Sequence, residues 1–249
     1  MDVKTASRVL DVLNLFADER RPLTYSEMAR LLEIPLSSCH GLLKTMVAHG
    51  FLYDFGSRQG YYPTQRLLHV ATSICSADPL INYFTPILQK LRNETEETAI
   101  LAKLAGHKVV YLNTIESKRT IRYSHEVGGF KLINATSTGK AIFAVMSDAD
   151  KKSVLTSLEK DFQTPTQKTL HSTDEFVRDV HKGSVRGWQS SYGENVDDVM
   201  SVAIGFLING EPYCLAVAGP LERMKRNEEK IGEAIQELVK TLPKNITGN

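Results

Sequence analysis

TYSEMARLLEIPLSSCHGLLKTMVAHG, residues 24–50, predicts two short helices joined by a tight break. Thr24 and Glu27 have the spacing of a capping box, so a first helix is expected to begin at Thr24. Ile34-Pro35 ends that helix, because the residue before a proline is pushed out of the helical region, and the proline can open a second helix. Gly50 is placed to end the second helix as a C-terminal cap.

The second helix is expected to have one apolar face and one small, polar face. The apolar residues recur at the spacing of a buried helix face, and they are Cys39, Leu42, Leu43, Met46 and Val47. The other face carries Ser37, Ser38, Gly41 and Lys44, with His40 at its margin. Such a helix can lie in a DNA major groove, which is about 12 Å wide. A helical hairpin inside a bundle would give the same apolar stripes.

The residues that follow favour DNA binding. Residues 51–55 are apolar and prone to form a strand, residues 56–60 form a turn with Arg58 at its tip, and Tyr61-Tyr62 returns as a second strand. A helix-turn-helix followed at once by a β-hairpin is a winged helix. The hairpin, or wing, could place Arg58 against a phosphate or in a minor groove. Taken alone, Arg58 would be a solvated turn residue.

Composition indicates a globular protein. The chain has 249 residues, of which 42% are apolar and 24% are charged, which is enough for one large or two modest domains. No run approaches the roughly 18 apolar residues of a membrane span, and no signal peptide is evident at the N-terminus, so we expect a cytoplasmic protein without a membrane partner. Cys39, Cys75 and Cys214 are odd in number and lack zinc-site spacing, so we expect them to be reduced and structural.

The charge of the chain is nearly balanced. The net charge is +1, and residues 1–75 carry eight Lys or Arg against seven Asp or Glu. Residues 34–66 are locally basic, with Lys44, Arg58 and Arg66 against Asp54. Each monomer should therefore contact few phosphates, and useful affinity for double-stranded DNA would need a dimer or a larger assembly.

The rest of the chain predicts an α+β fold. Ala6 to Phe16 and residues 64–76 have helical spacing, and the second of these is expected to connect two domains. Further helices are expected at 79–97, 142–146, 148–158, 173–185 and 222–242, and strands at 99–104, 109–112, 121–127, 188–192, 199–207 and 213–218. These elements predict one sheet with helices on its flanks. The predicted domains are 1–63, a linker helix at 64–78, and 79–249.

A loop of small and hydroxyl-bearing residues, Asn134 to Ala141, leads into the helix expected at 142–146. Free backbone N–H groups at a helix start can bind an anion, and Ser137 and Thr138 can add hydroxyl donors. The alternative is an ordinary helix cap.

At this point the chain resembles the IclR-type bacterial transcriptional regulators. The resemblance rests on SRVLDVLNLFAD, on residues 24–52 with the wing through YYPT, and on NATSTGKA, VRGWQSSYGEN, VMSVAIGF and AVAGP, in this order and spacing. It implies an N-terminal winged helix-turn-helix, a linker helix and a C-terminal GAF-like α/β effector-binding domain. It also implies homodimers that pair through the DNA-binding half and often assemble as dimers of dimers.

The polar face of the second helix and the wing predict that Ser37, Ser38, His40, Lys44 and Arg58 contact operator DNA. The resemblance implies that a small-molecule effector is bound by Ser137, Thr138, Glu194, Ser201, Ala216 and Ala218. Members of the family commonly have arginine at the position of Gly41, hydroxyls at the positions of Ala216 and Ala218, and glycine at that of Asp198. Lys44 is thus the sole cation of the second helix, and the pocket is less polar. A small carboxylic or aromatic acid is the expected effector.

The alternatives to a DNA-binding regulator are an enzyme and a sensor that binds a protein. An enzyme is not expected, and neither is a cofactor, because the chain has no P-loop, Rossmann fingerprint or G-x-S-x-G motif. Cys39 and His40 point about 100° apart on a helix, and Glu194 could pair with His125 or His171 only if the fold joined them. A sensor whose winged helix binds a protein would need an apolar recognition face, whereas Ser37, Ser38 and Lys44 are polar.

Overall fold

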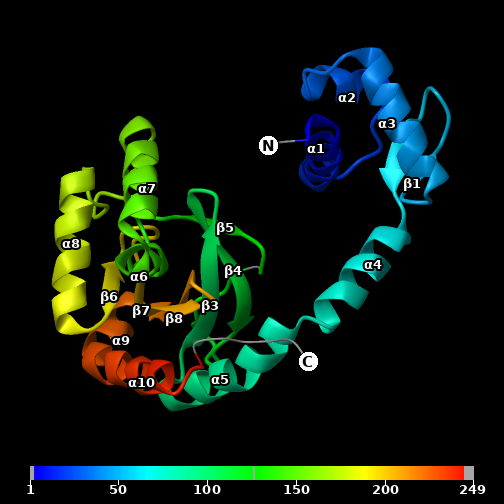
Figure 1. Ribbon diagram of the computed structural model, residues 1–249. Helices are drawn as coiled ribbons and strands as arrows, with labels where there is room; N and C mark the ends of the chain where they lie inside the picture. Colours follow the sequence, from blue (N-terminus) through cyan, green and yellow to red (C-terminus); the bar gives the residue numbers. More distant parts are fainter. Residues whose placement is uncertain (1–2, 126, 244–249) are drawn as a thin grey trace. The chain divides into compact units, whose positions relative to one another are not determined.

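The computed structural model of the chain describes residues 3–125 and 127–243 (Figure 1). They form two compact units, and the boundary between the units lies between Asp78 and Pro79 in the chain. The helix of the expected linker is counted with the first unit, and the division into three segments remains a prediction. Within the two described ranges, no helix is both long enough and apolar enough to cross a bilayer.

The first unit consists of helices packed on a small hairpin. Its elements are α1 (Lys4–Glu19), α2 (Tyr25–Leu31), α3 (Leu36–Ala48), β1 (Leu52–Asp54), β2 (Tyr61–Pro63) and α4 (Gln65–Ser76). The first three helices and the hairpin share one core, made of Val12, Phe16, Leu23, Met28, Ala29, Cys39, Leu43, Met46, Leu52 and Tyr61. This is the winged helix-turn-helix predicted from the sequence.

The local signals of residues 24–50 act as expected. The Thr24 hydroxyl accepts a hydrogen bond from the Glu27 N–H at 3.3 Å, and the Glu27 carboxylate accepts one from the Thr24 N–H at 2.9 Å. Hydrogen bonds from Thr24, together with one from Arg21, lower the pKa of Glu27 to about 2. Pro35 caps α3, and Gly50, with φ +76°, follows its end. The predicted capping box, proline start and glycine end are confirmed.

The wing is fixed to the helices by a close backbone contact. Leu23 forms an antiparallel bridge with Tyr61 next to the hairpin, in which Leu52 pairs with Pro63. Gly60 has φ +83°, and a Cβ atom there would lie 2.4 Å from the Leu23 carbonyl oxygen. Only glycine lets the wing come this close to the chain before α2.

The second unit contains a six-stranded antiparallel sheet with the order β5-β4-β3-β8-β7-β6. Its strands are β3 (Thr98–Ala105), β4 (Lys108–Ile115), β5 (Phe130–Leu132), β6 (Gln189–Tyr192), β7 (Val199–Ile208) and β8 (Glu211–Pro220). Its helices are α5 (Pro79–Thr95), α6 (Ser137–Val145), α7 (Asp148–Lys160), α8 (Thr173–Arg186), α9 (Leu221–Arg226) and α10 (Glu228–Lys240).

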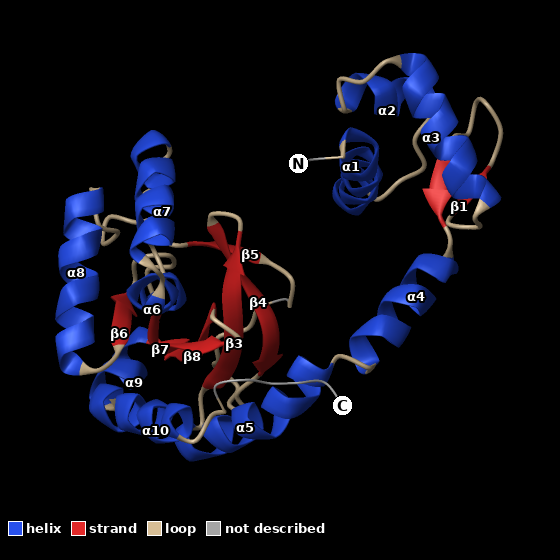
Figure 2. Ribbon diagram, in the orientation of Figure 1, coloured by secondary structure: helices blue, strands red, loops and turns tan. Residues whose placement is uncertain are grey.

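Each face of this sheet is covered by its own helices (Figure 2). Alternate residues of a strand point to opposite faces. Ile100 and Ala102 thus join a core with α6, α7 and α8, whereas Ala99 and Leu101 join a core with α5, α9 and α10. The α+β fold class with an N-terminal winged helix is confirmed.

One predicted strand is wrong. Residues 121–125 form no regular strand, residue 126 lies outside the described residues, and the strand that pairs with β4 is β5. The carbonyl oxygens of Ile121 and Tyr123 accept hydrogen bonds from the side chains of Arg223 and Thr98. Side chains from other elements thus take the backbone groups that a strand would have used.

Three further expectations need correction. Helix α6 begins at Ser137, five residues earlier than expected, because the Thr136 side chain caps it by accepting the Gly139 N–H at 3.1 Å. The closing helix is broken at Asn227 into α9 and α10. All three cysteines are free, as expected, but Cys75 is exposed on α4 and is therefore not part of a core.

Candidate functional site

Helix α3 presents the two faces that its sequence predicts. Cys39, Leu43 and Met46 are buried, while the flanking Leu42 and Val47 are only half-buried. On the other face, Ser37, Gly41 and Lys44 are exposed and Ser38 is half-buried. Apart from Leu36 in the first turn, which is 50% exposed, this face is made of small and polar residues and is free of carboxylates.

His40 lies at the margin of that face. It is half-buried, and its ring packs edge-on against Tyr25 of α2 with 5.4 Å between ring centroids. This contact restricts the imidazole between the two helices of the motif. His40 is thus less free to reach outward than Lys44.

Arg58 lies at the exposed tip of the wing. The turn that carries it is held by the Asp54 carboxylate, which accepts the Gly56 N–H at 2.8 Å. Across the described parts of the chain, neither Arg58 nor Lys44 makes a hydrogen bond or an ion pair. Both cations are therefore available to an anionic partner.

Only some of the residues expected to bind the effector line a cavity. Ser137 at the start of α6 donates a hydrogen bond to Ser201 of β7 at 2.7 Å, and Thr138 donates one to the Thr136 hydroxyl at 3.0 Å. A small cavity of about 20 Å³ adjoins them, with Ser201 and Ala218 in its wall. Ala216 is fully buried in the core and does not line this cavity.

Most of the residues that line the cavity are not among those predicted from the sequence. They come from segments far apart in the chain, and they are Tyr111, Tyr123, Ala135, Thr136, Ser191, Asn195, Val196 and Val199. Burial raises the pKa of Tyr111, whose hydroxyl interacts with those of Tyr123 and Thr138. The sequence signal that could have identified them is a small polar residue within a buried strand, such as Ser191. The lining carries hydroxyl and amide groups but no charged side chain.

Glu194 is not free to act as an acid or base with a histidine. Its carboxylate oxygen Oε1 lies 2.7 Å from Nζ of Lys140, which is wholly buried. Asp179 of α8 binds the same ammonium group at 2.7 Å, and the Ser190 carbonyl oxygen accepts from it at 3.1 Å. Burial raises the pKa of Glu194, and Lys140 counteracts this only in part. Lys140 lies in the segment NATSTGKA, where no local pattern indicates its partner.

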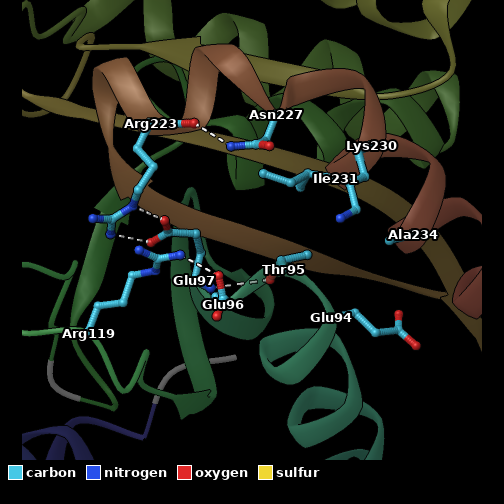
Figure 3. Close-up of a pocket in the computed structure, with 10 residues that line it drawn as sticks. All are labelled: Glu94, Thr95, Glu96, Glu97, Arg119, Arg223, Asn227, Lys230, Ile231 and Ala234. Carbon is cyan, nitrogen blue, oxygen red and sulfur yellow. Dashed lines mark hydrogen bonds and ion pairs between the residues drawn. The ribbon is translucent and has the colours of Figure 1, made fainter.

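A second hollow, of about 420 Å³, is lined by residues from the end of α5 and from α9 and α10 (Figure 3). Its charged lining is balanced, with Arg119, Arg223 and Lys230 against Glu94, Glu96 and Glu97. Arg223 is paired with Glu97 and Arg119 with Glu96. None of the expected effector residues lines this hollow, and its balanced charges give it no preference for an acid.

Two family models cover most of the chain. The "IclR helix-turn-helix domain" matches residues 5–54, and "Bacterial transcriptional regulator IclR C-terminal" matches residues 72–244. The first covers α1 to β1, and the second covers the sheet with all of its flanking helices.

Curated relatives match this chain over most of its length. HTH-type transcriptional regulator BhcR of Paracoccus denitrificans is 27% identical over 224 residues, which cover 89% of this chain and 79% of that protein. Transcriptional repressor IclR of Escherichia coli is 25% identical over 226 residues, covering 89% and 82%. Both carry the name of a transcriptional regulator.

Solved structures share the fold. A putative IclR transcriptional regulator from Silicibacter sp. TM1040 has a TM-score of 0.77 at 20% identity and covers 98% of this chain and 100% of its own. An IclR homolog from Microbacterium hydrocarbonoxydans, crystallised with 4-hydroxybenzoate, has a TM-score of 0.72 at 20% identity and covers 96% and 100%. With the winged helix, the helix-covered sheet and a family model that matches more than half of its residues, the chain belongs to the IclR family of bacterial transcriptional regulators and carries the DNA-binding helix-turn-helix of that family.

Proposed function

We propose that the chain is a ligand-responsive regulator in which α3 reads the major groove and the wing contacts the backbone. Ser37, Ser38, His40 and Lys44 would meet base edges and phosphates, and Arg58 would bind a phosphate or enter the minor groove. The observation that supports this assignment most is the narrow polar face of α3, whose one cation is unpaired in the described parts of the chain.

The proposed regulator is a homodimer, and two such dimers can assemble into a dimer of dimers. Helix α4 has no buried residue, and its apolar residues Leu68 and Ile74 are 62% and 67% exposed. Leu10 of α1 is 62% exposed as well. Pairing through these helices would cover apolar surface and would double the few cations that each monomer offers to DNA.

The proposed effector is a small organic acid, carboxylic or aromatic, that binds next to the start of α6. Hydroxyl groups converge there from Ser137, Thr138 and Ser201, and two tyrosines supply aromatic surface. The relative crystallised with 4-hydroxybenzoate gives an example of such a molecule. Effector could change DNA affinity only by binding two conformations unequally, with the linker helix of residues 64–78 carrying the change.

A gel-shift titration tests the DNA-binding half of the proposal. The purified chain is titrated against the DNA upstream of its own gene and against an unrelated fragment, each at two salt concentrations. Tight, sequence-selective binding with a salt dependence steeper than one module can give is the expected result. Weak and equal binding to both fragments would contradict it and would favour a protein partner for the winged helix, to which the half-exposed Leu36 of α3 could contribute.

A further inference from the structure

A buried ion pair joins the two sequence motifs GKA and GE. Lys140 lies in α6 directly after the loop that forms one side of the small cavity, and Glu194 follows β6. The two residues are 54 positions apart in the chain, yet Nζ of Lys140 lies 2.7 Å from Oε1 of Glu194. Neither the DNA-binding surface nor the lining of the cavity uses this pair.

Glu194 belongs to the segment that separates the cavity from solvent. The next two residues, Asn195 and Val196, line the cavity, and Val196 is also 46% exposed. The wall formed by residues 193–196 is therefore one residue thick at Val196. Its backbone is held by two hydroxyl groups: that of Thr169 donates to the Glu194 carbonyl oxygen at 2.6 Å, and that of Thr166 donates to the Gly193 carbonyl oxygen at 2.7 Å. The Lys140 ammonium holds the Glu194 side chain.

The cavity is too small for an organic acid while this wall stays in place. Its volume of about 20 Å³ is of the order needed for a single water molecule. Entry of a larger molecule thus requires a neighbouring segment to move. Gly193 has φ +74°, and a Cβ atom there would lie 2.6 Å from the Asp197 carbonyl oxygen. A turn that depends on glycine therefore forms the near end of this wall.

Two features of the ion pair permit Glu194 to separate from Lys140. The second carboxylate oxygen of Glu194, Oε2, is buried and has no hydrogen-bond partner among the described residues. Lys140, in contrast, keeps Asp179 and the Ser190 carbonyl oxygen when Glu194 leaves. The ammonium group would then not be stranded without a partner, which is the usual obstacle to breaking a buried ion pair.

We propose that Lys140 and Glu194 are positioning residues of the effector pocket: their ion pair holds the wall of residues 193–196 closed, and effector binding requires that wall to move. The inference rests on the proposed function of this pocket. It assigns the GKA and GE motifs a role in the access of effector, rather than in contact with it.

Hydrogen exchange on the full chain, without DNA or effector, tests the proposal. Two protected amides report on the wall and are called the wall amides: that of Gly193, which donates to the Val199 carbonyl oxygen at 2.8 Å, and that of Val199, which donates to the carbonyl oxygen of Val196 in the wall at 3.1 Å. In Lys140→Met we expect both amides to exchange about tenfold faster or more, since the side-chain anchor of the wall is lost. Amides of Leu101 and Leu215, in the central strands, should keep their wild-type rates.

Matched variants separate positioning from general stability. Lys182→Met removes an exposed lysine of α8 and should change none of these rates. Asp179→Asn leaves the pair of Lys140 with Glu194 in place and should change the wall amides little. Glu194→Gln should speed exchange in the wall, and its combination with Lys140→Met should add little to the single change, because both remove one contact.

Two results would overturn the proposal. The first is equal acceleration of the wall and of Leu101 and Leu215 in Lys140→Met, which would mean that the pair only stabilises the unit. The second is wild-type exchange of the wall in both Lys140→Met and Glu194→Gln. If Lys140→Met does not fold, Glu194→Gln against Asp179→Asn decides the question. Loss of DNA binding in the gel-shift assay would refute the proposed function without affecting this measurement.

Discussion

Lys44→Ala should weaken operator binding and make that binding less sensitive to salt. Lys44 is exposed on α3 and makes no hydrogen bond or ion pair with any other described residue, so its loss should leave the stability of the first unit almost unchanged. Its function is then limited to contacts outside the chain. We expect the effect in DNA binding alone.

The size of this effect follows from the number of cations involved. One phosphate contact contributes about 0.9 to the slope of log K against log salt, so two copies of Lys44 in a dimer contribute about 1.8. Between about 50 and 200 mM salt, the wild type should therefore lose about 12-fold more affinity than the variant loses. If Lys44 contacts a base instead, the slope changes less and preference at one operator position is relaxed by roughly 1–3 kcal/mol.

Fluorescence anisotropy with a labelled operator fragment measures this at four or more salt concentrations. Lys152→Ala, an exposed lysine of α7, is the matched control and should leave the slope unchanged. Gly41→Arg is the converse change, since a Cβ atom at Gly41 has no neighbour within 4 Å, and it should steepen the slope. An unchanged slope and affinity in Lys44→Ala would refute the placement of α3 in the major groove.

Three further changes have expected outcomes. Thr24→Ala should lower the free energy of unfolding of the first unit by roughly 1 kcal/mol in urea titrations. The variant keeps the backbone N–H of residue 24, which is the largest cause of the lowered pKa of Glu27, but loses the hydroxyl that donates to the same carboxylate at 2.8 Å. Part of the difference should therefore be present above the ordinary pKa of a glutamate and be lost as the pH falls towards 2, and a difference that grows as the pH falls would contradict it. Gly139→Ala should destabilise the second unit by about 1–3 kcal/mol or more, since its Cβ would lie 2.1 Å from the Ile133 carbonyl oxygen, and a wild-type melting temperature would refute this. Ser137→Phe should abolish the response to effector in the gel-shift assay while operator binding persists; loss of both together would count against separate sites.

The helix-turn-helix was predictable because its signals are local. The capping box, the proline at the start of α3 and the glycine after its end all act within 27 residues of chain, and helical periodicity identifies the buried face. The exposed positions of Ser37, Lys44 and Arg58 follow from that same periodicity and from the hairpin turn. These properties depend only on residues that lie near one another in the chain.

Tertiary structure decided what depends on distant partners. Residues 121–125 alternate large and polar side chains as a strand can, but Arg223 and Thr98 donate to the carbonyl oxygens of Ile121 and Tyr123, and no periodicity reveals such competitors. The cavity also depends on distant partners, because its lining brings Tyr111 together with Val196.

The buried ion pair shows most clearly where the two kinds of information separate. The sequence determined that Lys140 lies near the start of a helix and that Glu194 follows a short strand. Only the packing of α6 against β6 and α8 placed the ammonium group between two carboxylates. A hydrophobic pattern reports which side chains avoid water, whereas the partner of a buried charge is set by the sheet order and by the crossing of helices over it.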